Sequence, residues 1–258
     1  MSLSSAAGEV TFRRAEPVMG TVVSFDIRPR GLPARETTAA VLQACAVLHD
    51  ADACFSLYRE DSPLSRLRRG ELRPEEVPAE IGEVLDACRN VRELSGGWFD
   101  PWAAEGGVDP TGLVKGWAAE RALGVLREAG AGAAMVNAAG DIALFGGPAS
   151  GQRWRIGVRS PDAPDALCCV LEPEGAVATS GQYERGPHVW DPRTGAPARA
   201  ARSATVCGPS LTIADGLATG LLAAGEAGFS PIVAAGYEAM IIGADGGLAH
   251  TSGFPILG

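Results

Sequence analysis

Residues 213–219 carry an acidic and a hydroxyl side chain at a spacing that suits a divalent cation. Asp215 and Thr219 are four residues apart in a stretch, 211–224, whose pattern predicts a helix, so both oxygens face one side of it. Mg²⁺ takes oxygen ligands and keeps room for phosphate oxygens. A structural role is the alternative, because an aspartate near a helix start favours the helix dipole and a buried threonine often bonds the carbonyl four residues back.

A second segment, residues 176–197, presents a candidate general base. An apolar run ends at Ser180 and Gly181, which predicts a strand that breaks into a turn, and His188 follows. The turn-type sequence Asp191-Pro-Arg-Thr-Gly195 places the imidazole on a loop beside a carboxylate. Because the pKa of histidine lies near neutrality, His188 can act as a general base, or equally as a structural hydrogen-bonding group.

A third segment, residues 109–117, forms a glycine-containing turn before an expected helix. Such a turn leaves backbone N–H groups exposed, which suits an anion. Several aromatic side chains at element boundaries could stack on a flat ring, although most aromatic residues serve packing. The sequence has no G-x-S-x-G, H-E-x-x-H, Walker A or G-x-G-x-x-G motif. The common hydrolase, zinc-protease, NTPase and Rossmann interpretations therefore lose their main support.

Composition restricts the class of protein. The chain has 258 residues, of which 46% are hydrophobic and 21% charged, so it can bury a substantial core as one domain. The net charge of −9 leaves no broad basic surface, which argues against a nucleic-acid partner. The six cysteines show neither C-x-x-C spacing nor the density of a disulfide scaffold, and we expect them to be reduced.

The N-terminal residues and the hydropathy give expectations about location. Residues 1–9 are expected to lie outside the ordered part of a single domain that spans 1–258. We find no signal peptide, lipobox or run of about 18 consecutive apolar residues. The sequence as written therefore predicts a cytoplasmic protein with no membrane segment, while an export signal removed from the N-terminus stays an alternative.

The elements that must position the three segments follow from periodicity and turn residues. Residues 78–94 place apolar side chains at the i, i+3, i+4, i+7 spacing of an amphipathic helix that ends at Gly96-Gly97. We expect other helices at 33–53, directly after Ser62-Pro63, from 109 to about 130, and at 211–224. Strands are expected at 22–27, 134–137, 141–145, 154–158, 167–171, 176–181, 203–207, 239–242 and 248–250. Strands in succession between a few long helices predict an α+β or mixed α/β fold rather than a doubly wound one.

Eight short segments, each weak alone, occur in order through most of the chain. They are Met19-Gly-Thr21; Phe55-Ser-Leu-Tyr-Arg59 with Asp61-Ser-Pro-Leu-Ser-Arg-Leu67; Ser95-Gly-Gly-Trp-Phe-Asp-Pro101; Val108-Asp-Pro-Thr-Gly-Leu-Val-Lys-Gly116; Val136-Asn-Ala-Ala-Gly-Asp141; Ala178-Thr-Ser-Gly181; His188-Val-Trp-Asp-Pro-Arg-Thr-Gly195; and Ala214-Asp-Gly-Leu-Ala-Thr219. Together they resemble the ApbE family of FAD:protein FMN transferases.

The resemblance implies a T-fold-like α+β domain, with mixed or antiparallel sheets packed against several long helices. It also implies Mg²⁺-dependent transfer of the FMN moiety of FAD to a Thr or Ser hydroxyl of an acceptor protein, with release of AMP. Asp215 and Thr219 would be side-chain ligands of the metal, a backbone carbonyl at Gly112 or Thr111 would be the third ligand, and His188 would be the general base. The cofactor-binding residues it implies are Met19, Tyr58, Asp100, Asp109, Lys115, Asp141, Ser180, Gly181 and Asp191.

Two other functions stay open. An FAD pyrophosphatase would use the same metal and pocket and pass the phosphoryl group to water. A non-catalytic flavin-binding or trafficking protein would keep the motifs without turnover.

The chain also departs from the family pattern at Gly216 and Gly220, which replace alanines and are expected to loosen the metal helix by up to about 1 kcal/mol each.

Overall fold

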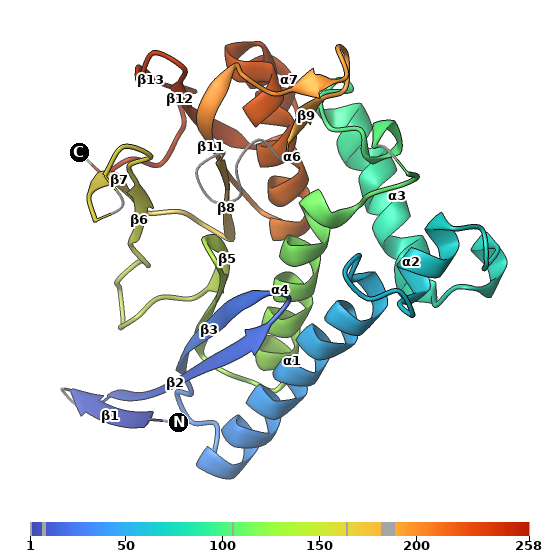
Figure 1. The fold of residues 1–258 in the computed structure, drawn as a ribbon. Helices are drawn as coiled ribbons and strands as arrows, with labels where there is room; N and C mark the ends of the chain where they lie inside the picture. Colours follow the sequence, from blue (N-terminus) through green and yellow to red (C-terminus); the bar gives the residue numbers. More distant parts are fainter. Residues whose placement is uncertain (1, 7–8, 105, 164, 182–188, 258) are drawn as a thin grey trace.

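Antiparallel strands form one large sheet, and helices cover one of its faces (Figure 1). The computed structural model describes residues 2–6, 9–104, 106–163, 165–181 and 189–257. Within them the nine strands of this sheet follow the order β1 (Ser2–Ala6), β2 (Glu9–Val18), β3 (Thr21–Arg28), β4 (Ala133–Ala138), β5 (Asp141–Phe145), β8 (Ala176–Gly181), β11 (Ala201–Gly208), β12 (Glu238–Gly243) and β13 (Leu248–His250). The expected α+β class with an antiparallel sheet is confirmed.

The other elements are two small strand pairs, six helices and three 3₁₀ turns within the described part of the chain. The pairs are β6 (Ile156–Arg159) with β7 (Leu167–Leu171), and β9 (Trp190–Asp191) with β10 (Ala196–Pro197). The helices are α1 (Ala34–Phe55), α2 (Pro63–Arg68), α3 (Ala79–Leu94), α4 (Thr111–Glu128), α6 (Leu211–Ala224) and α7 (Phe229–Ala234), and the turns are η1 (Pro74–Glu76), η2 (Pro101–Ala103) and η3 (Gly225–Gly228).

Two apolar cores lie on opposite faces of the large sheet. On one face α4 contacts β4 and β5, and α6 contacts β8 and β11, while α1 packs against α4 and also contacts β2. On the other face the β6–β7 hairpin covers a smaller core (Figure 1). Strand β11 supplies both cores, because successive side chains point to opposite faces: Ala204 and Val206 pack under the helices, and Cys207 packs under the hairpin.

Local sequence signals account for several element boundaries. The periodic residues of α3, Ile81, Val84, Cys88 and Val91, are all buried. Ser62 caps α2 as expected, since its hydroxyl accepts a hydrogen bond from the Ser65 N–H. Helix α6 begins and ends at the expected residues.

The strand expected at 22–27 is present as β3, and a second strand that was not expected, β2, precedes it. The two strands form a hairpin, β2–β3, whose two-residue turn is Met19-Gly20. Both turn residues have positive φ, 54° and 67°, as the twist of a tight hairpin requires. The sequence obscures this turn because methionine seldom adopts such a conformation. Strand β1 lies at the sheet edge, where it pairs with β2. The expectation that residues 1–9 lie outside the ordered domain stays a prediction.

One described stretch, Leu211–Ala234, is apolar and helical enough to span a membrane by length and composition alone. It comprises α6, η3 and α7, and more than half of its most apolar window is buried inside the protein. Helix α6 packs against α4, β8 and β11. Burial in the core therefore explains the apolar composition of this stretch.

Candidate functional site

The strand register brings predicted site residues from distant parts of the chain to one end of the sheet. Val23 pairs with Ala138, so the Met19-Gly20 turn lies on the same side as the turn between β4 and β5. Ile142 pairs with Val177, so Asp141 at the start of β5 lies beside the last residues of β8, which include Ser180 and Gly181. The first turns of α4 reach this same end, where Lys115 contacts Asp141.

Helices α4 and α6 meet through two glycines and the two predicted metal ligands. The Gly116 N–H donates to Asp215 Oδ2 over 2.8 Å, and the Thr219 hydroxyl donates to the Gly112 carbonyl over 3.2 Å. Because Gly112 and Gly116 have no Cβ and lie four residues apart on one face of α4, α6 comes close enough to reach one backbone donor and one backbone acceptor. Antiparallel packing aligns this pair with Asp215 and Thr219, which are also four residues apart.

The three predicted metal ligands form an oxygen-rich cluster at this crossing. Thr219 Oγ1 lies 3.2 Å from the Gly112 carbonyl and 3.3 Å from Ser180 Oγ. Asp215, one helical turn before Thr219, is buried, with 4% of the residue's surface exposed. Carboxylate, carbonyl and hydroxyl oxygens are the ligands that Mg²⁺ takes. The donor set therefore fits Mg²⁺, and no group of three or more His, Cys, Asp or Glu within the described residues offers another metal site.

Glycine suits this crossing because α4 and α6 approach closely. A Cβ on Gly112 would lie 3.2 Å from Thr219 Oγ1, and a Cβ on Gly116 would lie 2.7 Å from the Leu211 carbonyl oxygen. The glycines of α6 serve the same purpose: a Cβ on Gly216 would lie 2.8 Å from Val91 Cγ1, and one on Gly220 would lie 3.0 Å from the Phe99 N. The expected loosening of α6 by Gly216 and Gly220 is thus offset by closer packing against α3 and residue 99.

Lys115 and Asp141 form an ion pair at the sheet end. Asp141 is buried, with 1% of its surface exposed, and its Oδ1 accepts a hydrogen bond from the Thr179 N–H over 3.0 Å. The Thr179 N–H needs a side-chain acceptor because the pairing of β5 with β8 ends at Ile142 and Val177. The Lys115 side chain keeps 22% exposure, so its ammonium group is held by Asp141 while it remains reachable by an anion.

Met19 and Tyr58, the next two predicted cofactor-binding residues, differ in burial. Met19 packs against the core, and its φ of 54° is strained for a residue with a Cβ. Strain of this kind gathers at functional sites. Tyr58, in the loop after α1, is 95% exposed. An aromatic ring so exposed is free to stack on a flat ligand, but no described contact directs it to one.

The carboxylates of Asp100, Asp109 and Asp191 make local hydrogen bonds. Asp100 accepts from the Trp102 N–H over 3.0 Å, Asp109 from the Thr111 N–H over 3.0 Å, and Asp191 from the Arg193 N–H over 2.9 Å. These bonds shape the turns at the starts of η2 and α4 and after β9. The cofactor-binding role of the three aspartates stays a prediction.

His188 lies outside the described residues, but the segment that follows it is anchored. Val189 is buried, and the Arg193 guanidinium lies over the Trp98 ring, 3.5 Å from its centroid. Arg193 Nη2 also donates to the Gly96 carbonyl over 3.3 Å. The Asp191–Gly195 turn is therefore fixed to the loop after α3. Sequence reasoning did not identify Arg193, since a lone arginine in a turn carries no signal of a distant aromatic partner.

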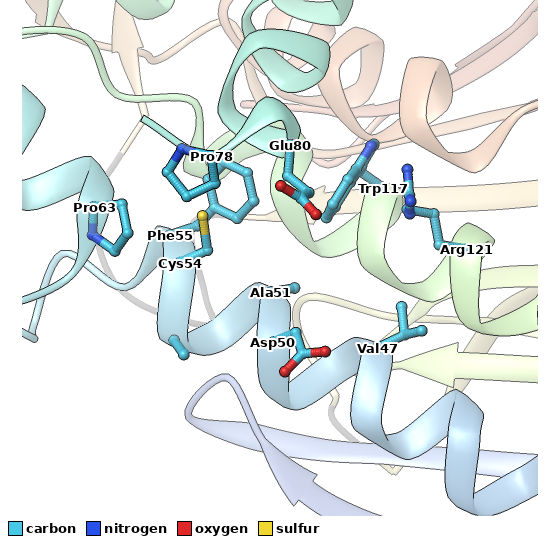
Figure 2. A pocket seen from close by; sticks show the side chains of 11 residues that line it. Val47, Asp50, Ala51, Cys54, Phe55, Pro63, Pro78, Glu80, Trp117 and Arg121 are labelled. Carbon is cyan, nitrogen blue, oxygen red and sulfur yellow. The ribbon is translucent and has the colours of Figure 1, made fainter. Parts of the chain in front are cut away.

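A surface groove of about 340 Å³ lies elsewhere, between α1, α4 and the starts of α2 and α3. Figure 2 shows apolar side chains of α1 and α4 in it, among them Phe55 and Trp117, with Asp50, Glu80 and Arg121 around them. Among the residues that the structure describes, no predicted site residue lines this groove. The cluster at the α4–α6 crossing is therefore the better candidate site.

Comparisons with known proteins identify the family of this chain. The model of the ApbE family matches residues 19–106 and 103–241. The chain is 34% identical over 172 residues to an FAD:protein FMN transferase of Vibrio cholerae, which covers 60% of this chain and 51% of the relative. It is 24% identical over 246 residues to one of Haemophilus influenzae, which covers 70% of this chain and 71% of the relative. The chain spans about half the length of the first of these relatives.

Solved structures show the same fold. The flavin transferase ApbE from Vibrio cholerae superposes with a TM-score of 0.80 at 24% identity and covers 94% of this chain and 97% of that chain. The ApbE protein from Thermotoga maritima superposes with a TM-score of 0.79 at 23% identity, over 94% of this chain and 97% of that chain. At these identities the likeness concerns the fold.

Proposed function

The chain belongs to the ApbE family, and from this premise we propose that it transfers the FMN moiety of FAD to a Thr or Ser hydroxyl of an acceptor protein. The proposal includes Mg²⁺ as cofactor and AMP as the released product. The observation that carries it is the oxygen cluster at the α4–α6 crossing, which contains the three residues expected to bind the metal. The curated relatives named FAD:protein FMN transferase support the reaction class.

Asp215, Thr219 and the Gly112 carbonyl would hold the metal. Bound there, Mg²⁺ would neutralise charge on the pyrophosphate oxygens of FAD and orient them. The protein's part is to keep these oxygens together before the substrate arrives. Gly116 does this for Asp215 with its N–H, and Ser180 lies beside Thr219. Preorganised donors cost no reorganisation at the moment of reaction.

Lys115 would supply the local positive charge that a protein with a net charge of −9 needs in order to bind an anion. Its ion pair with Asp141 holds the ammonium group at the sheet end, near the start of α4. Lysine binds phosphate as a point charge. We therefore assign Lys115 to the phosphates of FAD and Asp141 to the orientation of Lys115.

His188 is proposed as the general base of the transfer. It would take the proton of the acceptor hydroxyl, whose oxygen forms a bond to the phosphorus of the FMN half. The bond from that phosphorus to the bridging oxygen then breaks, and AMP leaves with that oxygen. An alcohol is a weak nucleophile at neutral pH, so a positioned base is the expected companion.

A mass measurement tests the reaction class. The protein is incubated with FAD, Mg²⁺ and an acceptor that carries an exposed Thr or Ser, and the acceptor is expected to gain one FMN. Formation of AMP and free FMN without a gain on the acceptor would identify a pyrophosphatase instead. Flavin binding without turnover would identify a non-catalytic flavin protein.

Two variants test the metal assignment in the same assay. Asp215→Asn is expected to abolish Mg²⁺-dependent transfer. Asp86→Asn is the matched control, since Asp86 is also helical but is 78% exposed on α3. Equal turnover of Asp215→Asn and the wild type would show that the metal assignment is wrong.

A further inference from the structure

Glu120 makes a third contact in the series that joins α4 to α6. Residues 112, 116 and 120 follow one another at four-residue steps along one face of α4. Gly112 meets Thr219, and Gly116 meets Asp215. Glu120 Oε2 accepts hydrogen bonds from the Ser210 hydroxyl and the Thr212 N–H, both over 2.9 Å, and from the Thr212 hydroxyl. The series thus runs from the oxygen cluster to the first turn of α6.

The carboxylate of Glu120 meets the N-terminus of α6, where it is electrostatically favoured. Ser210 is the N-cap of α6, and its hydroxyl also accepts from the Ile213 N–H over 3.4 Å. The Thr212 N–H belongs to the first turn and has no acceptor within the helix, so Glu120 satisfies it. Because a negative charge near a helix N-terminus is stabilising, this contact is stronger than a neutral one.

The three contacts together fix how far α6 can slide along α4. A helix rises 1.5 Å per residue, so a shift of α6 by one residue would move Asp215 out of register with the Gly116 N–H. Gly112 and Gly116 let α6 come close to α4, but without side chains they form only one hydrogen bond each with α6. Glu120 instead holds two side chains and one N–H of α6 at a single oxygen. Glu120 therefore makes three of the five hydrogen bonds that join α4 to α6 at these positions, whereas Gly112 and Gly116 make one each.

We propose that Glu120 is a positioning residue of the cation site, which sets the register of Asp215 and Thr219 against Gly116 and Gly112. This rests on the proposed function, since it presumes that Mg²⁺ binds at these oxygens. Glu120 does not touch the cation and acts through α6. Removal of a direct hydrogen-bond partner of a metal ligand commonly weakens metal binding by about 10- to 100-fold. Because Glu120 bonds to Ser210 and Thr212 and acts through the helix, we expect an effect at the lower end of this range.

Direct cation binding gives a test that does not depend on turnover. Mn²⁺ is titrated into the protein, with and without FAD, and the free ion is followed by electron paramagnetic resonance. Glu120→Ala is expected to raise the Kd for Mn²⁺ by about 10-fold, and Glu120→Gln by less, because an amide oxygen can still accept from Thr212. Glu128→Ala is the matched control, as Glu128 is exposed on the same helix.

Activity adds a second readout. At saturating Mg²⁺, transfer by Glu120→Gln should approach the wild-type kcat, while the Mg²⁺ concentration for half-maximal rate rises several-fold and the KM for FAD stays unchanged. A purely structural role would lower thermal stability and leave the Mg²⁺ dependence unmoved, and that result would overturn the inference. Glu120→Gln keeps the proposal testable if Glu120→Ala does not fold.

The same titration of Asp215→Asn separates this inference from the proposed function. If Asp215→Asn loses Mn²⁺ binding and the Glu120 variants bind as the wild type does, Glu120 has no positioning role although the cation site is real. If Asp215→Asn binds Mn²⁺ as the wild type does, the cation site itself is wrong, and the role of Glu120 is rejected with it.

Discussion

Gly116→Ala gives the sharpest test of the α4–α6 crossing, because a second glycine on the same helix supplies its control. At Gly124 an added Cβ would meet nothing within 4 Å, so Gly124→Ala should stabilise the protein by about 1 kcal/mol through helix propensity. At Gly116 the added Cβ would lie 2.7 Å from the Leu211 carbonyl oxygen and 2.8 Å from Asp215 Cβ. These distances are shorter than real Cβ contacts, so α6 must move.

The expected cost follows from these contacts. Overpacking of a filled interior costs about 1–3 kcal/mol. Displacement of α6 also weakens the hydrogen bond from the Gly116 N–H to the Asp215 carboxylate, a charged bond worth about 1.5–3 kcal/mol. The gain in helix propensity offsets about 1 kcal/mol. Gly116→Ala should therefore be less stable than the wild type by roughly 1–4 kcal/mol, since the first two terms are not fully additive.

Thermal unfolding followed by circular dichroism measures the difference. For a domain of this size 1 kcal/mol corresponds to about 2–4 °C in Tm, so the Tm of Gly116→Ala should lie well below that of Gly124→Ala, by on the order of 10 °C. The same displacement of α6 should raise the Mg²⁺ concentration for half-maximal transfer rate in Gly116→Ala, whereas Gly124→Ala should leave this concentration unchanged. Equal Tm values for the two variants would refute the close approach of α4 and α6 at Asp215.

Three further predictions concern other parts of the protein. The hydrogen bond from His49 holds the pKa of Glu16 below its usual value. Glu16 therefore stabilises the fold above about pH 4.5, and this stability is lost as the pH falls through the lowered pKa. When the free energy of unfolding is measured with urea at several pH values, Glu16→Gln should show a smaller loss of stability at acidic pH than the wild type. Burial raises the pKa of the Cys88 thiol to about 12, so mass spectrometry should find Cys88 unmodified by iodoacetamide at pH 8 until the protein unfolds. Arg193→Lys should lose the planar stack on Trp98 and slow transfer, whereas a rate equal to the wild type would show that the anchor is dispensable.

The sequence by itself determined the elements whose signals are local. The buried stripe of α3, the Ser62 cap of α2 and the ends of α6 depend on residues within a turn or two of one another. The ordered short segments also gave the family, because residue types and their order survive without any knowledge of contacts. The pair Asp215 and Thr219 was visible for the same reason, since four residues make one turn of a helix.

The tertiary structure alone decided how these groups meet. The contact of Gly112 with Thr219 joins residues 107 apart, and that of Gly116 with Asp215 joins residues 99 apart. Sequence reasoning read Gly216 and Gly220 as weaknesses of α6, whereas close packing against Val91 and Phe99 requires them. It passed over Glu120, whose partners lie about 90 residues away on α6. Local pattern could place a carboxylate on one face of a helix, but only the packing of α6 against α4 gave that carboxylate its neighbours.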